Sequence, residues 1–378
     1  MGYEDSLIDI CRQFTDEAVT ETEAVSEGHI NDTYFIRTAS GRFVLQRLQP
    51  KMDPEKLLYN FGLYSAVCEA VGWAYPKWMR CKDGNYFRTD AEGFRWRMYP
   101  YIEAETLKTP LTKEQLFACG KGLSKLHGLL QKLSAEPKPV YPMLHDLSVY
   151  CERYRATLSG SNLCEENRVP DIEEQIQRGI AGFLPNKRRT ETDNAESVNN
   201  LLKISEWKGM RSGTENTNEK CIIHGDAKLS NILFRNGEVI GMLDWDTVMA
   251  GSASEELADC IRSCCVNRGT FDREAAEVIV EGYRSGMREV PKEISAAGWL
   301  ETAGTGRTGT MMSEAINAEA GMAEPVLSHL PQAFDKINFE LALRYYTDVI
   351  SKEKVLKERY PGYRLTRVRE LLGVTWRE

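Results

Sequence analysis

Several patterns that would assign a function at once are missing from this chain of 378 residues. It has 10 cysteines but no Cys-x-x-Cys pair, and its 5 histidines are scattered, so the usual spacing of zinc ligands is absent. We therefore expect buried free thiols in a reducing compartment and predict no metal site from them. No apolar run approaches the ~20 residues that cross a bilayer, which argues against a membrane protein.

Basic residues are also in deficit, with 48 lysines and arginines against 56 aspartates and glutamates and a formal net charge of −8. This balance argues against a general binder of nucleic acid or of anionic membranes. The first residues are acidic and precede no apolar segment, so we expect no secretory signal and a cytoplasmic protein. The length exceeds what one hydrophobic core usually supports, which predicts two lobes or domains.

The most informative segment is residues 221–233, together with Asp244 after the next hairpin. An apolar strand leads into a turn carrying Asp226, and Lys228 and Asn231 follow at the spacing of a kinase catalytic loop. Phosphoryl transfer requires an oriented acceptor hydroxyl and neutralised phosphate charge. We therefore assign Asp226 as the base and Lys228 to a γ-phosphate oxygen of ATP. Asn231 and Asp244 offer the oxygen ligands that Mg²⁺ prefers beside nucleotide phosphates.

The alternative is that this segment is an ordinary polar turn followed by a strand-end carboxylate. One such residue alone would support that interpretation, but four polar types at fixed spacing between two apolar strands favour a functional site. His224 is expected to brace the loop, because Asp226 already supplies the base. His127, on a strongly periodic helix at 113–132, is expected to be a packed residue of the helix face.

The N-terminal region predicts a small antiparallel sheet. We expect a helix at 6–19, strands at 24–26, 33–38, 42–48, 85–89 and 94–102, and a helix at 53–70. Gly28 and Asn31 lie at a hairpin tip, where backbone amides can approach the phosphates of ATP. Tyr101 and Glu103 follow the last strand and are expected to contact the adenine through their main chain.

The strand at 42–48 lacks the lysine that protein kinases place there. Gln46 falls in the expected register and Arg47 carries the charge, and only one of them can face the cleft because side chains alternate. We favour Arg47 on chemical grounds, with Gln46 as the alternative. Tyr59 and Asn60 stand where a partner glutamate would be sought.

The remaining chain predicts helices at 171–183, 195–207, 335–353 and 364–372, and insertions at about 158–219 and 286–332. A Gly-x-Gly-x-x-Gly pattern at 304–309 follows no β-branched strand, so we interpret it as a loop and not as a dinucleotide site. We divide the chain into a nucleotide-binding lobe at 1–103 and a catalytic, acceptor-binding lobe at 104–378.

Beyond the catalytic loop, four stretches resemble one known group: 28–34, 43–48, 244–252 with 259–263, and 343–348. The chain resembles the aminoglycoside phosphotransferase and choline kinase superfamily, and most closely its N-acetylhexosamine 1-kinase-like branch. The resemblance implies an α+β, two-lobed, protein-kinase-like fold with a small antiparallel β N-lobe and a larger, mainly helical C-lobe. It implies ATP- and Mg²⁺-dependent transfer to a sugar, possibly to the anomeric hydroxyl of an N-acetylhexosamine. It places Asp246, Arg262 and Arg344 at or near the acceptor pocket.

The chain departs from that branch at several positions. It has Gly225 where the branch has asparagine, Ala250 in place of proline, Glu255-Glu256 in place of an aromatic–acid pair, and Val355 near an expected aromatic residue. The acidic pair could suit a cationic acceptor such as choline or an aminoglycoside. A nucleotide-binding pseudokinase is disfavoured because the base and both metal ligands are present. Protein kinase activity lacks support, since no Asp-Phe-Gly and Ala-Pro-Glu pair bounds an activation loop.

Overall fold

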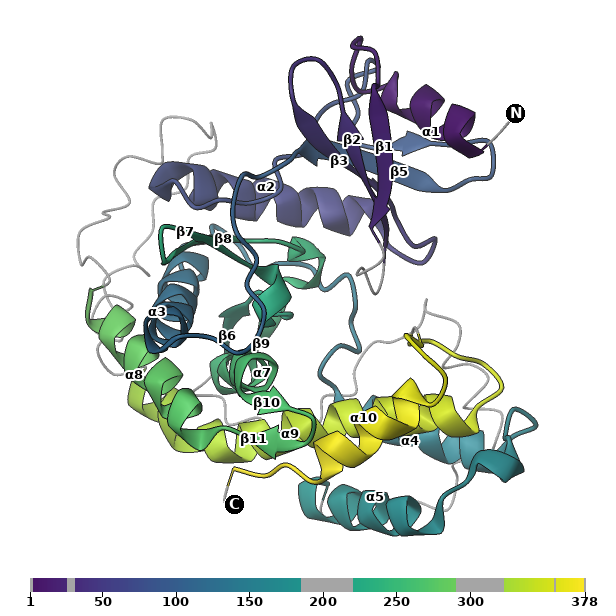
Figure 1. Ribbon diagram of the computed structural model, residues 1–378, viewed down its shortest axis with the longest axis vertical. Coiled ribbons are helices and arrows are strands. Elements are labelled where there is room, and N and C mark those ends of the chain that lie inside the picture. The colour runs from purple at the N-terminus through teal and green to yellow at the C-terminus, as the bar shows by residue number, and fades with distance from the viewer. Residues whose placement is uncertain (1–2, 26–30, 185–219, 290–322, 357, 377–378) are drawn as a thin grey trace.

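The computed structural model describes residues 3–25, 31–184, 220–289, 323–356 and 358–376. Gly28, the helix expected at 195–207 and the loop at 304–309 lie outside the described residues. The fold is the predicted α+β, two-lobed, protein-kinase-like one, with a sheet-rich lobe at the top of Figure 1 and a mainly helical lobe below it. No helix among the described residues is long and apolar enough to cross a membrane.

The N-terminal lobe is built on one antiparallel sheet. Its strands follow the spatial order β1 (Glu21–Val25), β2 (Asp32–Arg37), β3 (Arg42–Arg47), β5 (Arg95–Pro100) and β4 (Arg88–Thr89). Helix α1 (Tyr3–Cys11) covers one face, whose buried side chains are Tyr34, Ile36, Leu45, Trp96 and Met98. Because side chains alternate along a strand, Val44 and Tyr99 point to the opposite face. That face shares a core with α2 (Pro54–Val71) and with the second lobe.

Helix α2 begins and ends where local chemistry dictates. Asp53 accepts hydrogen bonds from the backbone N–H groups of Glu55 and Lys56, and Pro54 occupies the first turn, where its missing N–H costs nothing. Gly72 ends the helix in a left-handed conformation with φ of 69°. These signals are local, which is why the sequence predicted this helix almost to its ends.

The second lobe has two packed groups of helices. The larger core joins α3 (Lys113–Leu130), α7 (Ala253–Cys265), α8 (Arg273–Glu289) and the first half of α9 (Ala323–Ile350). A second core joins the other half of α9 to α4 (Leu147–Ser159), α5 (Pro170–Phe183) and α10 (Tyr363–Leu372). Three two-stranded antiparallel sheets complete the described part of the lobe. Two are hairpins, β7 (Ile232–Arg235) with β8 (Glu238–Met242) and β10 (Val266–Asn267) with β11 (Thr270–Phe271), and the third pairs β6 (Lys220–Ile223) with β9 (Met249–Ser252).

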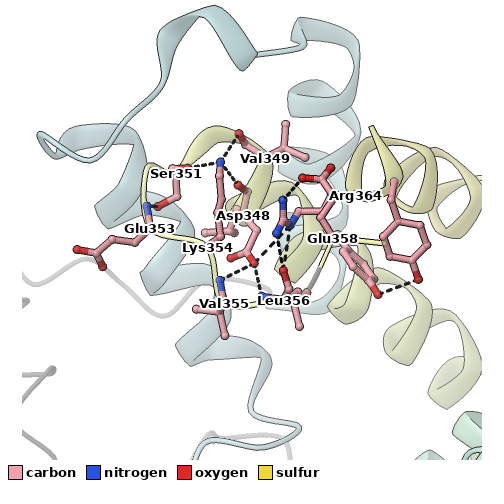
Figure 2. Close-up of polar contacts among 12 residues, drawn as sticks. Asp348, Val349, Ser351, Glu353, Lys354, Val355, Leu356, Glu358 and Arg364 are labelled. Carbon is pink, nitrogen blue, oxygen red and sulfur yellow. Dashed lines mark hydrogen bonds and ion pairs between the residues drawn. The ribbon is translucent and has the colours of Figure 1, made fainter. Parts of the chain in front are cut away.

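A polar network fixes the chain where it leaves α9 (Figure 2). The fully buried carboxylate of Asp348 accepts the backbone N–H groups of Val355 and Leu356 at 2.8 and 2.6 Å. The ammonium group of Lys354 donates to backbone carbonyls in the last turn of α9, which satisfies groups that have no partner within the helix. The guanidinium of Arg364 donates to the carbonyl of Leu356. The segment around Val355 is therefore held to α9 by charge-assisted hydrogen bonds.

Three expected elements differ from the structure. The first helix ends at Cys11 and not near residue 19, because turn bonds to the carbonyls of Ile10 and Cys11 close it. Strand β4 covers only Arg88–Thr89. Helix α9 begins at Ala323, inside the region expected to be an insertion, and it continues through Pro331. Its Val326 and Leu330 are buried in the core, so tertiary packing outweighs the proline.

Candidate active site

Strand β6 and the hairpin that follows bring the four predicted catalytic residues together. Asp226 follows β6, and Asn231 ends a short 3-10 turn. The side-chain Nδ2 of Asn231 donates to Oδ2 of Asp226 at 2.9 Å. The ammonium of Lys228 lies 2.5 Å from the same Oδ2. The backbone N–H of Leu243 donates to the carbonyl of Asn231 at 2.8 Å, which places Asp244 beside this group. The spacing in the sequence thus corresponds to one compact cluster.

The ion pair at the centre of the cluster keeps both groups charged. Burial opposes ionisation of Asp226, but the Lys228 ammonium and the Asn231 amide hold the pKa of this carboxyl below its ordinary value. Burial likewise opposes the charge of Lys228, whereas Asp226 and Asp244 raise its pKa above the ordinary value. An ionised Asp226 can accept a proton from a hydroxyl group placed beside it.

Gly225 explains one departure from the resembled branch. Its φ of +85° lies in the left-handed region, and a Cβ atom built on it would stand 2.4 Å from the carbonyl oxygen of Thr247. An asparagine at this position would therefore require the turn at Trp245–Thr247 to move. The same turn binds the loop in another way, because the hydroxyl of Thr247 donates to the carbonyl of His224 at 2.9 Å.

A buried carboxylate on α7 holds the catalytic loop from behind. Glu256 accepts the backbone N–H groups of His224 and Gly225 at 3.1 and 2.6 Å. Its Oε2 also lies 2.7 Å from Nε2 of His127, whose Nδ1 is 2.7 Å from the hydroxyl of Tyr283. Burial alone would raise the pKa of Glu256, but the contact with His127 and the neighbouring donors lower it. Glu256 is thus an internal anchor.

This arrangement removes the argument for a cationic acceptor that rested on Glu255-Glu256. Glu256 forms hydrogen bonds with the loop and with His127, and Glu255 pairs with Lys336 of α9. Both carboxylates therefore have partners inside the protein. His224, with its backbone bound on both sides and its ring 5.1 Å from the ring of Trp245, is placed as a packed residue of the loop.

The donor set beside Asp226 fits a magnesium ion. Asp244 adopts a left-handed conformation with φ of 61°, which directs the chain around the site. Burial, together with the carboxylates of Asp246 and Asp226, raises the pKa of Asp244 to about 7, so the site holds more negative charge than it can neutralise. Among the described residues no group of three or more His, Cys, Asp or Glu side chains could hold a metal ion alone. An ion held by Asn231 and Asp244 would therefore complete its coordination with nucleotide and water oxygens.

Asp246, expected at or near the acceptor pocket, is bound to an arginine of the N-terminal sheet. Its Oδ1 and Oδ2 accept hydrogen bonds from Nη1 and Nη2 of Arg97 at 2.6 and 2.7 Å, in a forked pair that is almost fully buried. The amide of Asn31 also donates to Oδ2 at 3.3 Å. The structure therefore places Asp246 in a contact between the two lobes.

The structure also separates Gln46 from Arg47. Gln46 faces the second lobe, where its Oε1 accepts from Nε and Nη2 of Arg97 at 2.9 and 2.7 Å. Arg47 points to the opposite, α1-covered face, where it pairs with Asp32 and lies 4.6 Å from the centre of the Phe94 ring. The preference for Arg47 as the cleft residue is thus not matched by the structure, because strand register and not side-chain charge decides which residue faces inward.

In the connection between the lobes, some main-chain groups already form hydrogen bonds within the protein. The N–H of Tyr101 donates to the carbonyl of Arg42, and the carbonyl of Glu103 accepts from Arg235 at 2.7 Å. The side chain of Glu103 pairs with Arg42. A nucleotide base that binds here would therefore use the carbonyl of Tyr101 as an acceptor and the N–H of Glu103, two residues later, as a donor.

The two predicted acceptor arginines have different surroundings. Arg262 is committed to Asp259, one turn earlier on α7, through two donors at 3.0 and 2.7 Å. Arg344 has a much looser partner, since its Nη1 lies 4.0 Å from Oε1 of Glu340, and its guanidinium lies 5.0 Å from the centre of the Tyr150 ring. Arg344 thus retains donors that a ligand could use.

Sequence reasoning missed four residues of this site: Arg97, His145, Glu256 in its anchoring role, and Glu340. His145 joins the catalytic loop to α9, with Nε2 2.9 Å from the carbonyl of Gly225 and Nδ1 3.5 Å from Glu340. Burial opposes its charge, but Glu340 raises the pKa of His145 to about 9. The one available signal was Arg97, an arginine between the large apolar residues Trp96 and Met98 of the strand. The others become visible only when distant helices are packed together.

Comparisons with known proteins show a family and a fold for this chain. The family model described as the phosphotransferase enzyme family matches residues 21–293. A homoserine kinase of Phenylobacterium zucineum (strain HLK1) is 22% identical over 284 residues, which cover 75% of this chain and 76% of that protein. Among solved structures, a microcompartment-associated aminopropanol kinase has a TM-score of 0.56 at 12% identity and covers 97% of this chain and 94% of its own. An amicoumacin kinase in complex with AMP-PNP has a TM-score of 0.55 at 9% identity, with 91% and 86% covered.

Proposed function

Because this chain belongs to the phosphotransferase enzyme family, we propose that it transfers the γ-phosphoryl group of ATP to a hydroxyl of a small molecule, with Mg²⁺ as cofactor and a neutral sugar as acceptor. The observation that carries the proposal is the cluster of Asp226, Lys228, Asn231 and Asp244. It combines an ionised base, a cation and two oxygen ligands.

In this proposal Asp226 accepts the proton of the acceptor hydroxyl as that oxygen attacks the γ-phosphorus, and ADP leaves as the bond from the γ-phosphorus to the β,γ-bridging oxygen breaks. Lys228 steadies a phosphate oxygen, and its ion pair keeps Asp226 ionised and oriented. Asn231 and Asp244 would hold Mg²⁺, which neutralises charge on the phosphates when it is bound. The carbonyl of Tyr101 and the N–H of Glu103 would bind the adenine edge, and Asn31 would lie at the end of the loop over the phosphates.

The sugar assignment rests on the resembled branch and on Arg344, whose donors can hydrogen-bond hydroxyl or amide oxygens. The anomeric hydroxyl of an N-acetylhexosamine remains its most specific form. The cationic alternative is weakened because Glu255 and Glu256 have internal partners. The pseudokinase alternative is disfavoured because the base and the metal ligands are present.

A second candidate acceptor is a hydroxy amino acid. The homoserine kinase relative motivates it, and the loosely bound guanidinium of Arg344 supports it, because a forked donor suits a carboxylate. Glu340 lies one turn before Arg344 on α9, and its Oε2 is buried without a hydrogen-bond partner among the described residues, so this oxygen could accept from the ammonium group of such a substrate.

Release of ADP from ATP and Mg²⁺ tests the function. The acceptor panel contains N-acetylhexosamines, homoserine, choline and an aminoglycoside, and the Asp226→Asn protein is the control for contaminating kinases. Turnover with N-acetylhexosamines alone supports the sugar proposal, and turnover with homoserine alone selects the second candidate. Nucleotide binding without turnover on any acceptor would contradict the proposed activity.

A further inference from the structure

Arg97 is a buried arginine in the middle of β5, and neither the base, the metal site nor the acceptor pocket accounts for it. Arg97 lies directly opposite Gln46 in the pairing of β3 with β5, on the sheet face that looks toward the second lobe. Four of its hydrogen bonds are formed inside the protein, two with Gln46 and two with Asp246. Since a guanidinium has five N–H donors, almost its whole capacity is used.

The ion pair crosses from one lobe to the other. Arg97 belongs to the N-terminal sheet, and Asp246 lies two residues after Asp244 in the loop assigned to the metal. Asn31 joins the same carboxylate from the end of the expected phosphate loop, and its Oδ1 accepts the backbone N–H of Gln49 at 3.3 Å. The segments that would surround the nucleotide phosphates therefore meet at Asp246.

The third strand and the following helix carry other residues here than in protein kinases. Protein kinases pair a lysine of the third strand with a glutamate of the following helix, and both belong to the N-terminal lobe. Here the third strand offers the neutral Gln46. On α2, Asn60 is turned to the backbone of Lys138, with bonds of 2.8 Å in both directions. Glu69 of the same helix pairs with Lys77.

A buried ion pair is not an efficient way to gain stability, because desolvation of two charges offsets much of their attraction. The forked geometry does, however, define position and angle closely. The Arg97–Asp246 pair is suited to hold two structural parts in register, and those parts are the nucleotide-facing sheet and the loop of Asp244.

We propose that Arg97 is a positioning residue that takes the place of the missing lysine of the third strand. Acting through Asp246, it holds the metal-binding loop against the sheet face over the nucleotide phosphates. The inference rests on the proposed function and adds the residue that couples the lobes. Direct contact of Arg97 with phosphate is disfavoured, because its donors are already committed.

The test measures binding of AMP-PNP by calorimetry, with Mg²⁺ and with EDTA, so that no acceptor is needed. Arg97→Gln is expected to weaken Mg²⁺–AMP-PNP binding by about tenfold or more, while affinity in EDTA changes by less than about threefold. Arg97→Lys keeps the charge without the fork and should recover part of the loss. Asp246→Asn should reproduce the pattern of Arg97→Gln.

Arg364→Gln is the matched control, since it removes another buried, multiply bonded arginine, whose partners are Glu358, Leu356 and Asp348 and not the residues assigned to the nucleotide (Figure 2). It should lower thermal stability and leave both nucleotide affinities unchanged. If Arg97→Gln does not fold, Arg97→Lys and Asp246→Asn carry the test. Unchanged Mg²⁺-dependent affinity in the folded variants would overturn the inference. Tighter nucleotide binding by Asp246→Asn would also overturn it, because it would mean that Arg97, once released from Asp246, binds phosphate directly. A wild-type chain that binds no nucleotide would instead overturn the proposed function.

Discussion

Nε2 of His127 on α3 lies 2.7 Å from Oε2 of Glu256 on α7, and both side chains are buried. The two helices thus meet at a carboxylate that also accepts two backbone N–H groups of the catalytic loop. The position of Asp226 therefore depends on the packing of α3 and α7, although neither helix carries the base, the lysine or the metal ligands assigned to phosphoryl transfer.

The first prediction follows from this contact. Glu256→Gln keeps the shape of the side chain but removes the negative charge that strengthens its hydrogen bonds. A hydrogen bond to a charged group is worth about 1.5–3 kcal/mol. We expect kcat to fall by roughly 10- to 100-fold, with the KM for ATP nearly unchanged. Steady-state kinetics checks this, and Glu277→Gln, which removes an exposed carboxylate on α8, is the control. Equal kcat in both variants would show that the anchor is not needed.

The second prediction concerns the base. Asp226→Asn retains size and hydrogen bonding but cannot accept a proton. Turnover should fall by roughly 10²–10⁴-fold, the usual scale of general base catalysis, while nucleotide affinity stays within a few-fold. Stopped-time assays of ADP release and direct nucleotide binding separate the two effects. Retained turnover would remove Asp226 from the role of base.

The third prediction is a pH dependence of Asp244. Its folded pKa of about 7 is raised above the unfolded value by burial and by Asp246 and Asp226. The corresponding stability is fully present below the unfolded pKa and is lost as the pH rises through about 7. We expect the metal-free protein to lose thermal stability between about pH 5 and about pH 8, and Asp244→Asn to lose less.

Magnesium should reverse this trend, because it binds the ionised carboxylate. In wild type, Mg²⁺ with AMP-PNP should raise the melting temperature more at about pH 8 than at about pH 5.5. In Asp244→Asn the Mg²⁺-dependent part of the increase should be absent. Identical melting profiles of the two proteins with and without the ion would argue against Asp244 as a ligand.

The fourth prediction addresses the acceptor. If Arg344 binds acceptor oxygens through its fork, Arg344→Lys loses a contact worth about 1–3 kcal/mol, and the kcat/KM for the acceptor falls by roughly 5- to 150-fold. The KM for ATP should hardly change. If Arg344 instead serves mainly to pack on Tyr150 and Glu340, the variant will melt at a lower temperature with unchanged acceptor kinetics, and its assignment to the acceptor pocket fails.

The sequence by itself determined the features that depend on neighbouring residues. Helix α2 follows from Asp53, Pro54 and Gly72, because caps act within one turn. The fold class followed from the family resemblance. The grouping of Asp226 with Asn231 also follows from local spacing, since a tight turn and one hairpin join them.

Only the tertiary structure decided which side chains face the nucleotide and which are consumed by internal partners. Charge favoured Arg47, but register with β2 and β5 turns Gln46 inward and brings Arg97 beside it. In the sequence, Asp246 and Glu256 both looked available to bind a substrate. In the fold, Asp246 pairs with Arg97 of β5 and Glu256 with His127 of α3. The Arg97–Asp246 and His127–Glu256 contacts join residues more than a hundred positions apart, and no local pattern records them, because they exist only when separate elements have packed.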